Sequence, residues 1–198
     1  MINQSQIQAW LQDWAIQIVD NKDYLSDLDN AIGDGDHGFN MAKGFSAYQE
    51  VRATKEVPNI GEEFKLLAMT LLSKVGGASG PLYSSAFLAM AKESSDKSEV
   101  SPLELADLFE LGLEAIMKRG KAVPFDKTMI DCWKPAIEAL RANELTIEKV
   151  DEIVEATAPM KALKGRASYL GDRSIGHIDP GSSSSGLMFK SLIKEVGL

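Results

Sequence analysis

The segment 29–40 reads DNAIGDGDHGFN and carries the densest group of chemically useful residues in the chain. Asp29, Asp34 and Asp36 alternate with glycines that let the backbone turn sharply. Hard divalent cations prefer several converging carboxylate oxygens, and carboxylates held this close repel each other without a cation. The simpler alternative is a solvated acidic loop in which Asp36 caps a helix, because aspartate is ordinary at turns and helix starts. The number of acidic, glycine, histidine and asparagine residues in so short a segment favours a magnesium site.

Two familiar loop types do not fit this segment. An EF-hand beginning at Asp29 would place Asp34 where the loop needs glycine and Asn40 where it needs a bidentate glutamate. The sequence also lacks the GxxxxGK[ST] phosphate loop. Phosphates bound here would have to be held through metal ions and helix N-termini. A magnesium site of this kind is suited to holding the phosphates of a nucleotide for phosphoryl transfer, and that is the function we expect for the segment.

Two other glycine-rich segments could contact phosphates. Residues 76–80 precede Pro81 and include the Ser79 hydroxyl, an arrangement that exposes amides to an anion at a helix start. The equally good alternative is that one helix simply ends in these glycines and the next begins at Pro81, without a ligand. The polar segment 165–186 contains Arg166 and Arg173, which could reach phosphates or simply form surface ion pairs.

Composition limits the partners. The net charge of -8 and pI near 4.9 argue against a nucleic-acid partner, and they require divalent cations wherever a polyphosphate binds. Apolar stretches are too short to cross a membrane, and the amino terminus lacks a secretion signal. The single cysteine, Cys132, excludes an internal disulfide. We expect a cytoplasmic protein without a membrane partner.

Apolar residues recur at steps of three and four along most of the chain, which predicts about eight amphipathic helices and no substantial sheet. Such helices bury their stripes in an all-α bundle or barrel, and residues 1–198 fit one domain. The serines 182–185 are expected in the first turn of the last helix, with hydroxyls that cap its amides. The longer connections expected are 24–38, 76–80, 120–127 and 165–186.

Four motifs in this order resemble the nucleotide-binding L subunits of bacterial dihydroxyacetone kinases: DNAIGDGDHGFNM, VGGASGPLYSSAF, PFDKTMIDCWKPA and KALKGRASYLGDRSIGHIDPGSSSSG. The resemblance covers nearly the whole chain. It implies a barrel of about eight antiparallel helices with the nucleotide at one end. It also implies that Asp29, Asp34 and Asp36 bind two Mg²⁺ ions that bridge to the phosphates.

The same resemblance implies a set of site residues. The catalytic group comprises Asp29, Asp34, Asp36 and Arg166, because two metals and one arginine supply the charge that phosphoryl transfer needs. The implied nucleotide pocket is lined by His37, Gly38, Asn40, Met41, Ala78, Ser79, Gly120, Thr128, Met129, Arg166, Asp179, Pro180 and Gly181.

Length separates the branches of this family. A stand-alone module of this size resembles the subunit that keeps ADP tightly bound, so that a phosphohistidine-carrying phosphotransferase-system partner regenerates ATP in place. The γ-phosphoryl would then pass to dihydroxyacetone on a separate kinase subunit. His37 and His177 lie inside nucleotide-associated motifs and are not expected to carry phosphate themselves. A fatty acid kinase module and a non-enzymatic nucleotide-sensing subunit stay open as alternatives, and a homodimer is compatible with the sequence.

Overall fold

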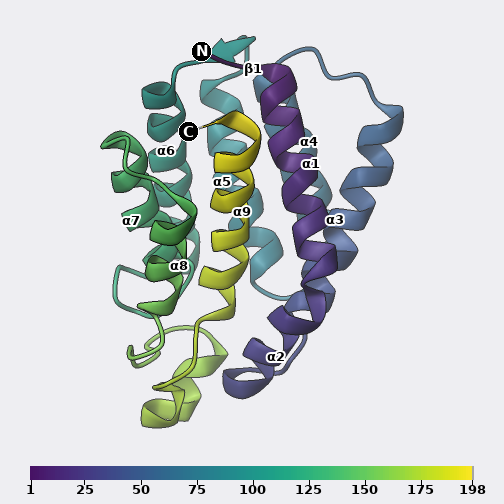
Figure 1. Cartoon of the computed structure of the whole chain (residues 1–198). Coiled ribbons are helices and arrows are strands. Elements are labelled where there is room, and N and C mark those ends of the chain that lie inside the picture. The colour runs from purple at the N-terminus through teal and green to yellow at the C-terminus, as the bar shows by residue number, and fades with distance from the viewer. Residues whose placement is uncertain (198) are drawn as a thin grey trace.

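The computed structural model describes residues 1–197, and helices dominate it (Figure 1). A two-stranded antiparallel sheet places Ile2 opposite Val100. The elements in chain order are β1 (Ile2–Asn3), α1 (Gln4–Asp20), α2 (Lys22–Ile32), α3 (His37–Thr54), α4 (Ile60–Lys74), α5 (Ser79–Glu93), β2 (Glu99–Val100), α6 (Pro102–Gly120), α7 (Ile130–Arg141), α8 (Ile147–Glu155), the 3-10 helix η1 (Arg166–Ser174) and α9 (Pro180–Val196). None of the described helices combines the length and apolar character that a membrane span requires.

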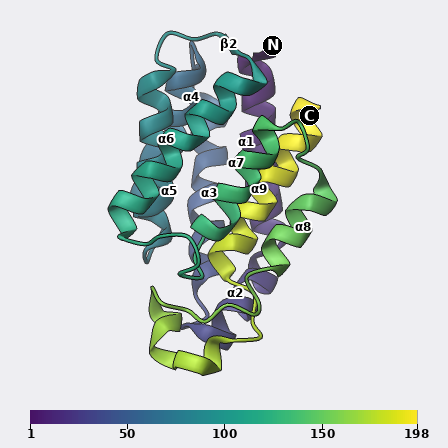
Figure 2. The same cartoon turned by 90° about the vertical axis from the view of Figure 1, so that its left-hand side faces the viewer.

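Eight helices close into a barrel. Neighbouring helices pack in the order α1, α3, α4, α5, α6, α7, α8, α9 and back to α1, and successive members run in opposite directions (Figures 1 and 2). Helices α2 and η1 lie beyond one end of this ring, at the end away from both termini. The prediction of an all-α barrel of antiparallel helices is therefore confirmed.

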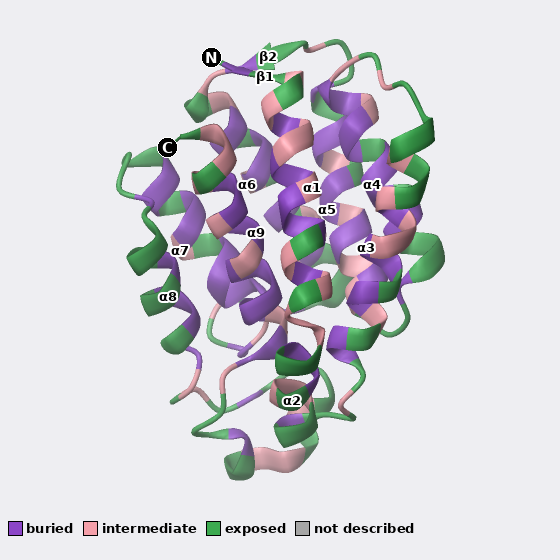
Figure 3. Cartoon of the chain, turned by 45° about the vertical axis from the view of Figure 1, so that its right-hand side comes forward, coloured by how far each residue is buried: buried purple, intermediate pink, exposed green. Residues whose placement is uncertain are grey.

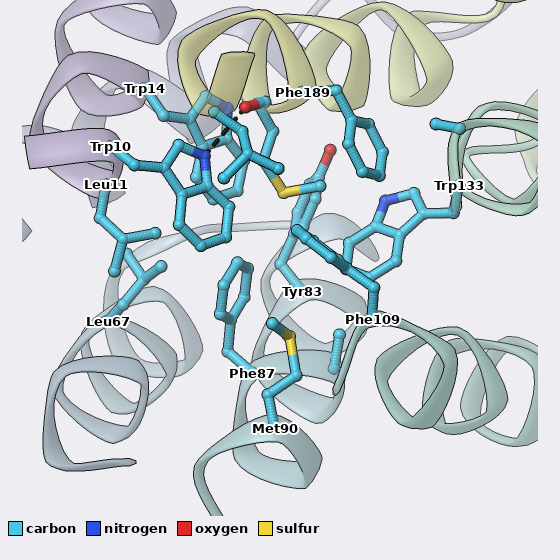
Figure 4. Packing of buried hydrophobic residues seen from close by; sticks show 14 of the residues in the cluster. Trp10, Leu11, Trp14, Leu67, Tyr83, Phe87, Met90, Phe109, Trp133 and Phe189 are labelled. Atoms are coloured by element: carbon cyan, nitrogen blue, oxygen red, sulfur yellow. Dashed lines mark hydrogen bonds between the residues drawn. The ribbon is translucent and has the colours of Figure 1, made fainter. Parts of the chain in front are cut away.

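The barrel interior is filled by aromatic side chains (Figure 4). In α1 the residues Trp10 and Trp14 follow the predicted spacing and are fully buried. The ring centroids of Trp10 and Phe109 are 5.5 Å apart, and those of Trp14 and Phe45 are 4.4 Å apart in an edge-to-face arrangement. Buried and exposed residues follow one another along the helices of the ring, as amphipathic helices require (Figure 3). The packing of these large aromatic side chains stabilises the helices and so fixes the positions of their ends.

The expected connection 24–38 is wrong over most of its length, because α2 extends from Lys22 to Ile32. Leu25 and Ile32 are buried, so a narrow apolar stripe stabilises this helix. Gly38 permits the close approach of α2 and α3, since a Cβ there would lie 1.9 Å from the Lys22 carbonyl oxygen. Asp29 consequently lies on the last turn of a helix, and the irregular part of the acidic segment shrinks to residues 33–36.

The serine run does lie in the first turns of α9, as predicted, but its hydroxyls do not have the expected capping role. The Asp179 carboxylate caps this helix by accepting the Ser182 amide at 2.7 Å. The Ser184 and Ser185 hydroxyls instead contact Tyr83 of α5, each at 2.8 Å. The long Tyr83 side chain reaches across the barrel interior, so these serine hydroxyls link α9 to α5 on the other side of the ring.

Candidate functional site

The four sequence motifs meet at the end of the barrel that lies opposite the termini. Segments 33–36, 75–78, 121–129 and 156–179 all connect helices at this end (Figure 2). They surround a cavity of about 220 Å³. Its lining includes Asp29, Asp34, Asp36, His37, Asn40, Ala78, Ser79, Thr128, Met129, Arg166, Asp179, Pro180 and Gly181.

The three aspartates converge as a metal site requires. One carboxylate oxygen from each of Asp29, Asp34 and Asp36 lies within 4.8 Å of the other two. Asp29 is oriented by its second role, because its Oδ2 accepts the amides of Asp36 at 3.0 Å and His37 at 3.1 Å. Gly33 leaves room for this carboxylate, since a Cβ there would lie 2.2 Å from Asp29 Oδ1. This all-oxygen set suits a hard divalent cation such as Mg²⁺.

Asp36 occupies the position before α3 that the simpler interpretation gave it. Among the described residues, however, its side chain makes no capping hydrogen bond. The Asp29 carboxylate takes the first amides of α3 instead. Asp36 is exposed and free to coordinate a cation, which favours the metal interpretation over plain capping.

Arg166 reaches the acidic cluster from η1. Its Nε lies 3.0 Å from Asp34 Oδ2, and its side chain remains 71% exposed. Arg166 belongs to the arm, which we define as residues 158–176 and which includes η1. The arm lies beside α2 (Figure 1). Arg173 and His177 lie outside the cavity lining, so only one of the two predicted arginines is placed to meet a phosphate.

His37 links three elements under the cavity. Its Nδ1 lies 3.1 Å from the Ser79 hydroxyl of α5, and its Nε2 lies 3.0 Å from the Ser184 hydroxyl of α9. Burial lowers the pKa of His37 to about 4, although the neighbouring Asp36 carboxylate opposes the shift. The ring is therefore neutral at physiological pH, and hydroxyls can satisfy both of its nitrogens. His37 joins the starts of α3, α5 and α9.

Asp179 is a buried carboxyl at the start of α9. Its backbone amide donates to the Thr157 hydroxyl at 3.0 Å, and its side chain accepts the Ser182 amide. Burial raises the pKa of Asp179 to about 7, while the hydrogen bond from Ser182 opposes this shift. Lys127, another lining residue, offers a compensating positive charge nearby.

Three residues predicted in the nucleotide pocket are not part of the cavity lining. Gly38 packs against α2, Met41 is fully buried in the core, and Gly120 lies against Leu82. Lys127 and Leu82 line the cavity but were not predicted from the sequence, and Gly77 lines it within the segment 76–80, which was expected to contact phosphates. Lys127 and Gly77 are next to predicted residues within the same motifs, so their position in those motifs was the available signal.

A comparison with family models matches residues 31–194 to the DAK2 domain. The chain belongs to the DAK2-domain family. The DAK2 match contains Asp34, Asp36 and all of the second and third motifs, and it begins just after Asp29.

Curated DAK2-domain relatives match this chain over nearly their whole length. The Listeria innocua protein named PEP-dependent dihydroxyacetone kinase 1, ADP-binding subunit DhaL, is 49% identical, over 93% of this chain and 93% of that protein. The Lactococcus lactis protein named PTS-dependent dihydroxyacetone kinase, ADP-binding subunit DhaL, is also 49% identical, over 94% of this chain and 95% of that protein.

A solved structure shows the same DAK2 fold. The dihydroxyacetone kinase of C. freundii in complex with AMP-PNP and Mg²⁺ superimposes with a TM-score of 0.76, at 24% identity, over 96% of this chain. The matched region is 34% of that longer kinase, so this chain spans about a third of its length. The likeness establishes the fold of this DAK2 domain.

Proposed function

We propose that this chain is the ADP-binding subunit of a phosphoenolpyruvate-dependent dihydroxyacetone kinase. A phosphohistidine-carrying phosphotransferase-system partner would pass its phosphoryl group to bound ADP, and the resulting ATP would pass its γ-phosphoryl to dihydroxyacetone on a separate subunit. The observation that carries the proposal is the convergence of three carboxylate oxygens within 4.8 Å at the mouth of the cavity. The names of the relatives, at 49% identity, supply the substrate.

Electrostatics explain why the site is built from carboxylates. In a chain of net charge -8, a nucleotide meets an unfavourable field, so phosphates can bind at this end only where cations invert it. Two Mg²⁺ ions held by Asp29, Asp34 and Asp36 would neutralise charge on the phosphates during transfer. We propose that Arg166, which lies beside Asp34 in the cavity lining, stabilises the phosphoryl group as it moves.

Helix N-termini supply the remaining phosphate contacts. Helix α5 begins at Ser79 after Ala78, and within the described residues no side chain caps its first amides. The start of α5 borders the cavity, since Ala78 and Ser79 line it. An anion bound there would accept hydrogen bonds from these amides. His37 fixes the Ser79 hydroxyl beside them. We propose that the polyphosphate lies between this helix start and the aspartates.

The rim of the cavity suits the docking of partner subunits. Four large apolar side chains are more than half exposed there, and each lies within two residues of a lining residue: Phe39 (53%), Phe125 (75%), Leu163 (57%) and Tyr169 (87%). Exposed apolar groups that gather around a site mark interaction surfaces. We propose that the dihydroxyacetone-bearing subunit and the phosphohistidine carrier dock at this rim, and that both act in the cytoplasm.

Retention of the nucleotide tests the proposal. ADP should stay with the purified chain through desalting in Mg²⁺ and leave in EDTA. The variant Asp34→Asn should weaken Mg²⁺-dependent ADP binding by at least about tenfold, because it removes one of three anionic ligands. Asp96 is also an exposed aspartate but lies in the α5–β2 connection at the other end of the barrel, so Asp96→Asn is the matched control and should retain ADP. A chain that binds no ADP, or binds it equally well in EDTA, would contradict the proposal.

A further inference from the structure

Lys127 is a buried lysine whose ammonium is fully occupied by the protein. Its side chain is 1% exposed, although it borders the nucleotide cavity. The Nζ donates to the backbone carbonyls of Ala158 at 3.3 Å, Met160 at 3.0 Å and Ser174 at 2.6 Å. A lysine ammonium has three protons, and here all three have protein acceptors. Lys127 is therefore poorly placed to be a direct phosphate ligand.

The local backbone directs this side chain inward. Lys127 has φ +60° and Phe125 has φ +74°, a region that residues other than glycine seldom adopt. The Asp131 carboxylate holds this turn by accepting the Phe125 amide at 2.5 Å and the Thr128 amide at 2.9 Å. The same turn exposes the ring of Phe125 and buries the ammonium of Lys127. Unfavourable backbone angles kept by surrounding bonds suggest a functional constraint.

The three carbonyls lie at the two ends of the arm (residues 158–176), where it leaves and rejoins the barrel. The Gly176 amide donates to the Ala158 carbonyl at 2.7 Å, and the Ala162 amide donates to the Ser174 hydroxyl at 2.9 Å. The arm packs against α2 through η1 and leaves the side chains of Leu163 and Tyr169 exposed. The polar contacts at its base, which include the Leu163 amide donating to the Asp126 carbonyl at 3.0 Å, therefore help to fix where the arm lies.

We propose that Lys127 is a positioning residue that fixes the base of the arm and so places Arg166 over the acidic cluster. Arg166 lies near the middle of the arm, and its contact with Asp34 at 3.0 Å depends on where the arm begins and ends. The part of this inference that concerns Arg166 in phosphoryl transfer rests on the proposed function. The part that concerns the arm depends only on the contacts of Lys127.

The three carbonyls around Nζ require the charged form of Lys127. An ammonium has one proton for each carbonyl, whereas a neutral amine has only two protons. Burial lowers the pKa of Lys127, and the neighbouring Asp179 carboxylate opposes that shift. Loss of the ammonium would take the Lys127 hydrogen bond from all three carbonyls, and the Ala158 carbonyl would keep the Gly176 amide.

Hydrogen exchange tests the arm directly and needs no activity. In Lys127→Met, the amides of Ala162, Leu163 and Gly176 should exchange at least about tenfold faster, while those of α1 and α6 keep their protection. Lys121→Met is a matched control, since Lys121 lies in the same connection, also has positive φ and is exposed. Unchanged exchange in the arm, or faster exchange throughout the barrel, would overturn the proposal. If Lys127→Met does not fold, Lys127→Gln is measured against the same criteria.

A double-mutant cycle tests whether Lys127 acts through Arg166. Lys127→Met should reduce phosphoryl transfer in the wild-type background and change it by less than about twofold in an Arg166→Ala background. The reason is that the effects of two mutations are not additive when one residue acts through the other. An equal loss in both backgrounds would show that Lys127 acts on the nucleotide itself. If the wild-type chain transfers no phosphate, the proposed function fails while the exchange result still decides the role of Lys127 in the arm.

Discussion

Asp29 both caps the start of α3 and belongs to the carboxylate cluster, whereas Asp34 and Asp36 belong only to the cluster. Its carboxylate is oriented by the amides of Asp36 and His37, and it also faces the point where the three carboxylates converge. Asp34 is more exposed, and its described partner is Arg166. Removal of either carboxylate should impair cation binding, but only the loss of Asp29 should also release the start of α3.

We therefore predict different stability effects for two alanine variants. Asp29→Ala should lower the free energy of unfolding by about 1–2 kcal/mol, as the loss of a helix cap does. Asp34→Ala should change it by less than about 0.5 kcal/mol, as is usual for surface residues. Urea unfolding of both variants in EDTA, without nucleotide, measures the difference. Equal destabilisation would show that Asp29 does not organise the helix start.

Asp179 gives the fold a pH dependence of known sign. Burial raises its pKa to about 7, whereas an unfolded chain gives aspartate a pKa of about 3.9. The folded state therefore binds the proton more tightly. Its contribution to stability is complete below about pH 4 and is lost as the pH rises towards 7. The Asp131 carboxylate adds to the shift, and the Lys127 ammonium opposes it.

Asp179→Asn should abolish this dependence while its amide oxygen still accepts the Ser182 amide. We expect the variant to be more stable than wild type by about 1–3 kcal/mol at pH 8, because a buried charge is removed, and to lose that advantage at pH 4. The difference between the urea unfolding curves of the two proteins at several pH values isolates Asp179. A constant difference across pH 4–8 would count against a protonated Asp179 in the fold.

At the scale of elements, helix α2 marks the limit of what the sequence could predict. The helical stripes of the barrel were predictable, because apolar residues repeat over several turns and face one shared core. In α2 the stripe is short and lies among aspartates, and its stability comes from close packing on α3 at Gly38. A contact between two elements cannot be derived from the spacing within one of them.

In the functional site, too, some residues could be predicted from the sequence and others could not. Asp34, Asp36 and Ser79 were identifiable because their chemical types and neighbouring glycines are visible in short motifs. The role of Lys127 was not, because its three acceptors lie 31 to 47 residues further along the chain. The absence of Gly120 from the lining likewise depends on how α6 packs against Leu82.

Helix α9 ties the site to the core through its serines. Ser184→Ala should lower the free energy of unfolding by about 1–3 kcal/mol, because buried His37 and Tyr83 would each lose a partner. Ser191→Ala is the matched control, since within residues 1–197 the buried Ser191 hydroxyl has no hydrogen-bond partner. Its removal should be neutral or stabilising. Thermal unfolding of both variants distinguishes them, and an equal loss in each would mean that the polar chain under the cavity contributes nothing.

On the scale of the whole molecule, the alternating direction of the helices explains the order of the motifs. In a closed antiparallel ring every second connection falls at the same end, so motifs that are far apart in sequence meet around one cavity. The other end carries the short sheet and both termini. One continuous hydrophobic core lies between these connections and the other end, which is in keeping with our proposal that residues 1–198 are one domain.

The central claim is that this end of the barrel holds a nucleotide that is recharged in place. The most direct measurement mixes the ADP-loaded chain with its dihydroxyacetone-binding subunit and the phosphohistidine carrier system, and follows labelled phosphate from phosphoenolpyruvate to dihydroxyacetone without free ATP. We predict many turnovers for each bound nucleotide with wild type, and none with Asp34→Asn. Transfer that requires added ATP, or that survives the loss of Asp34, would contradict the account.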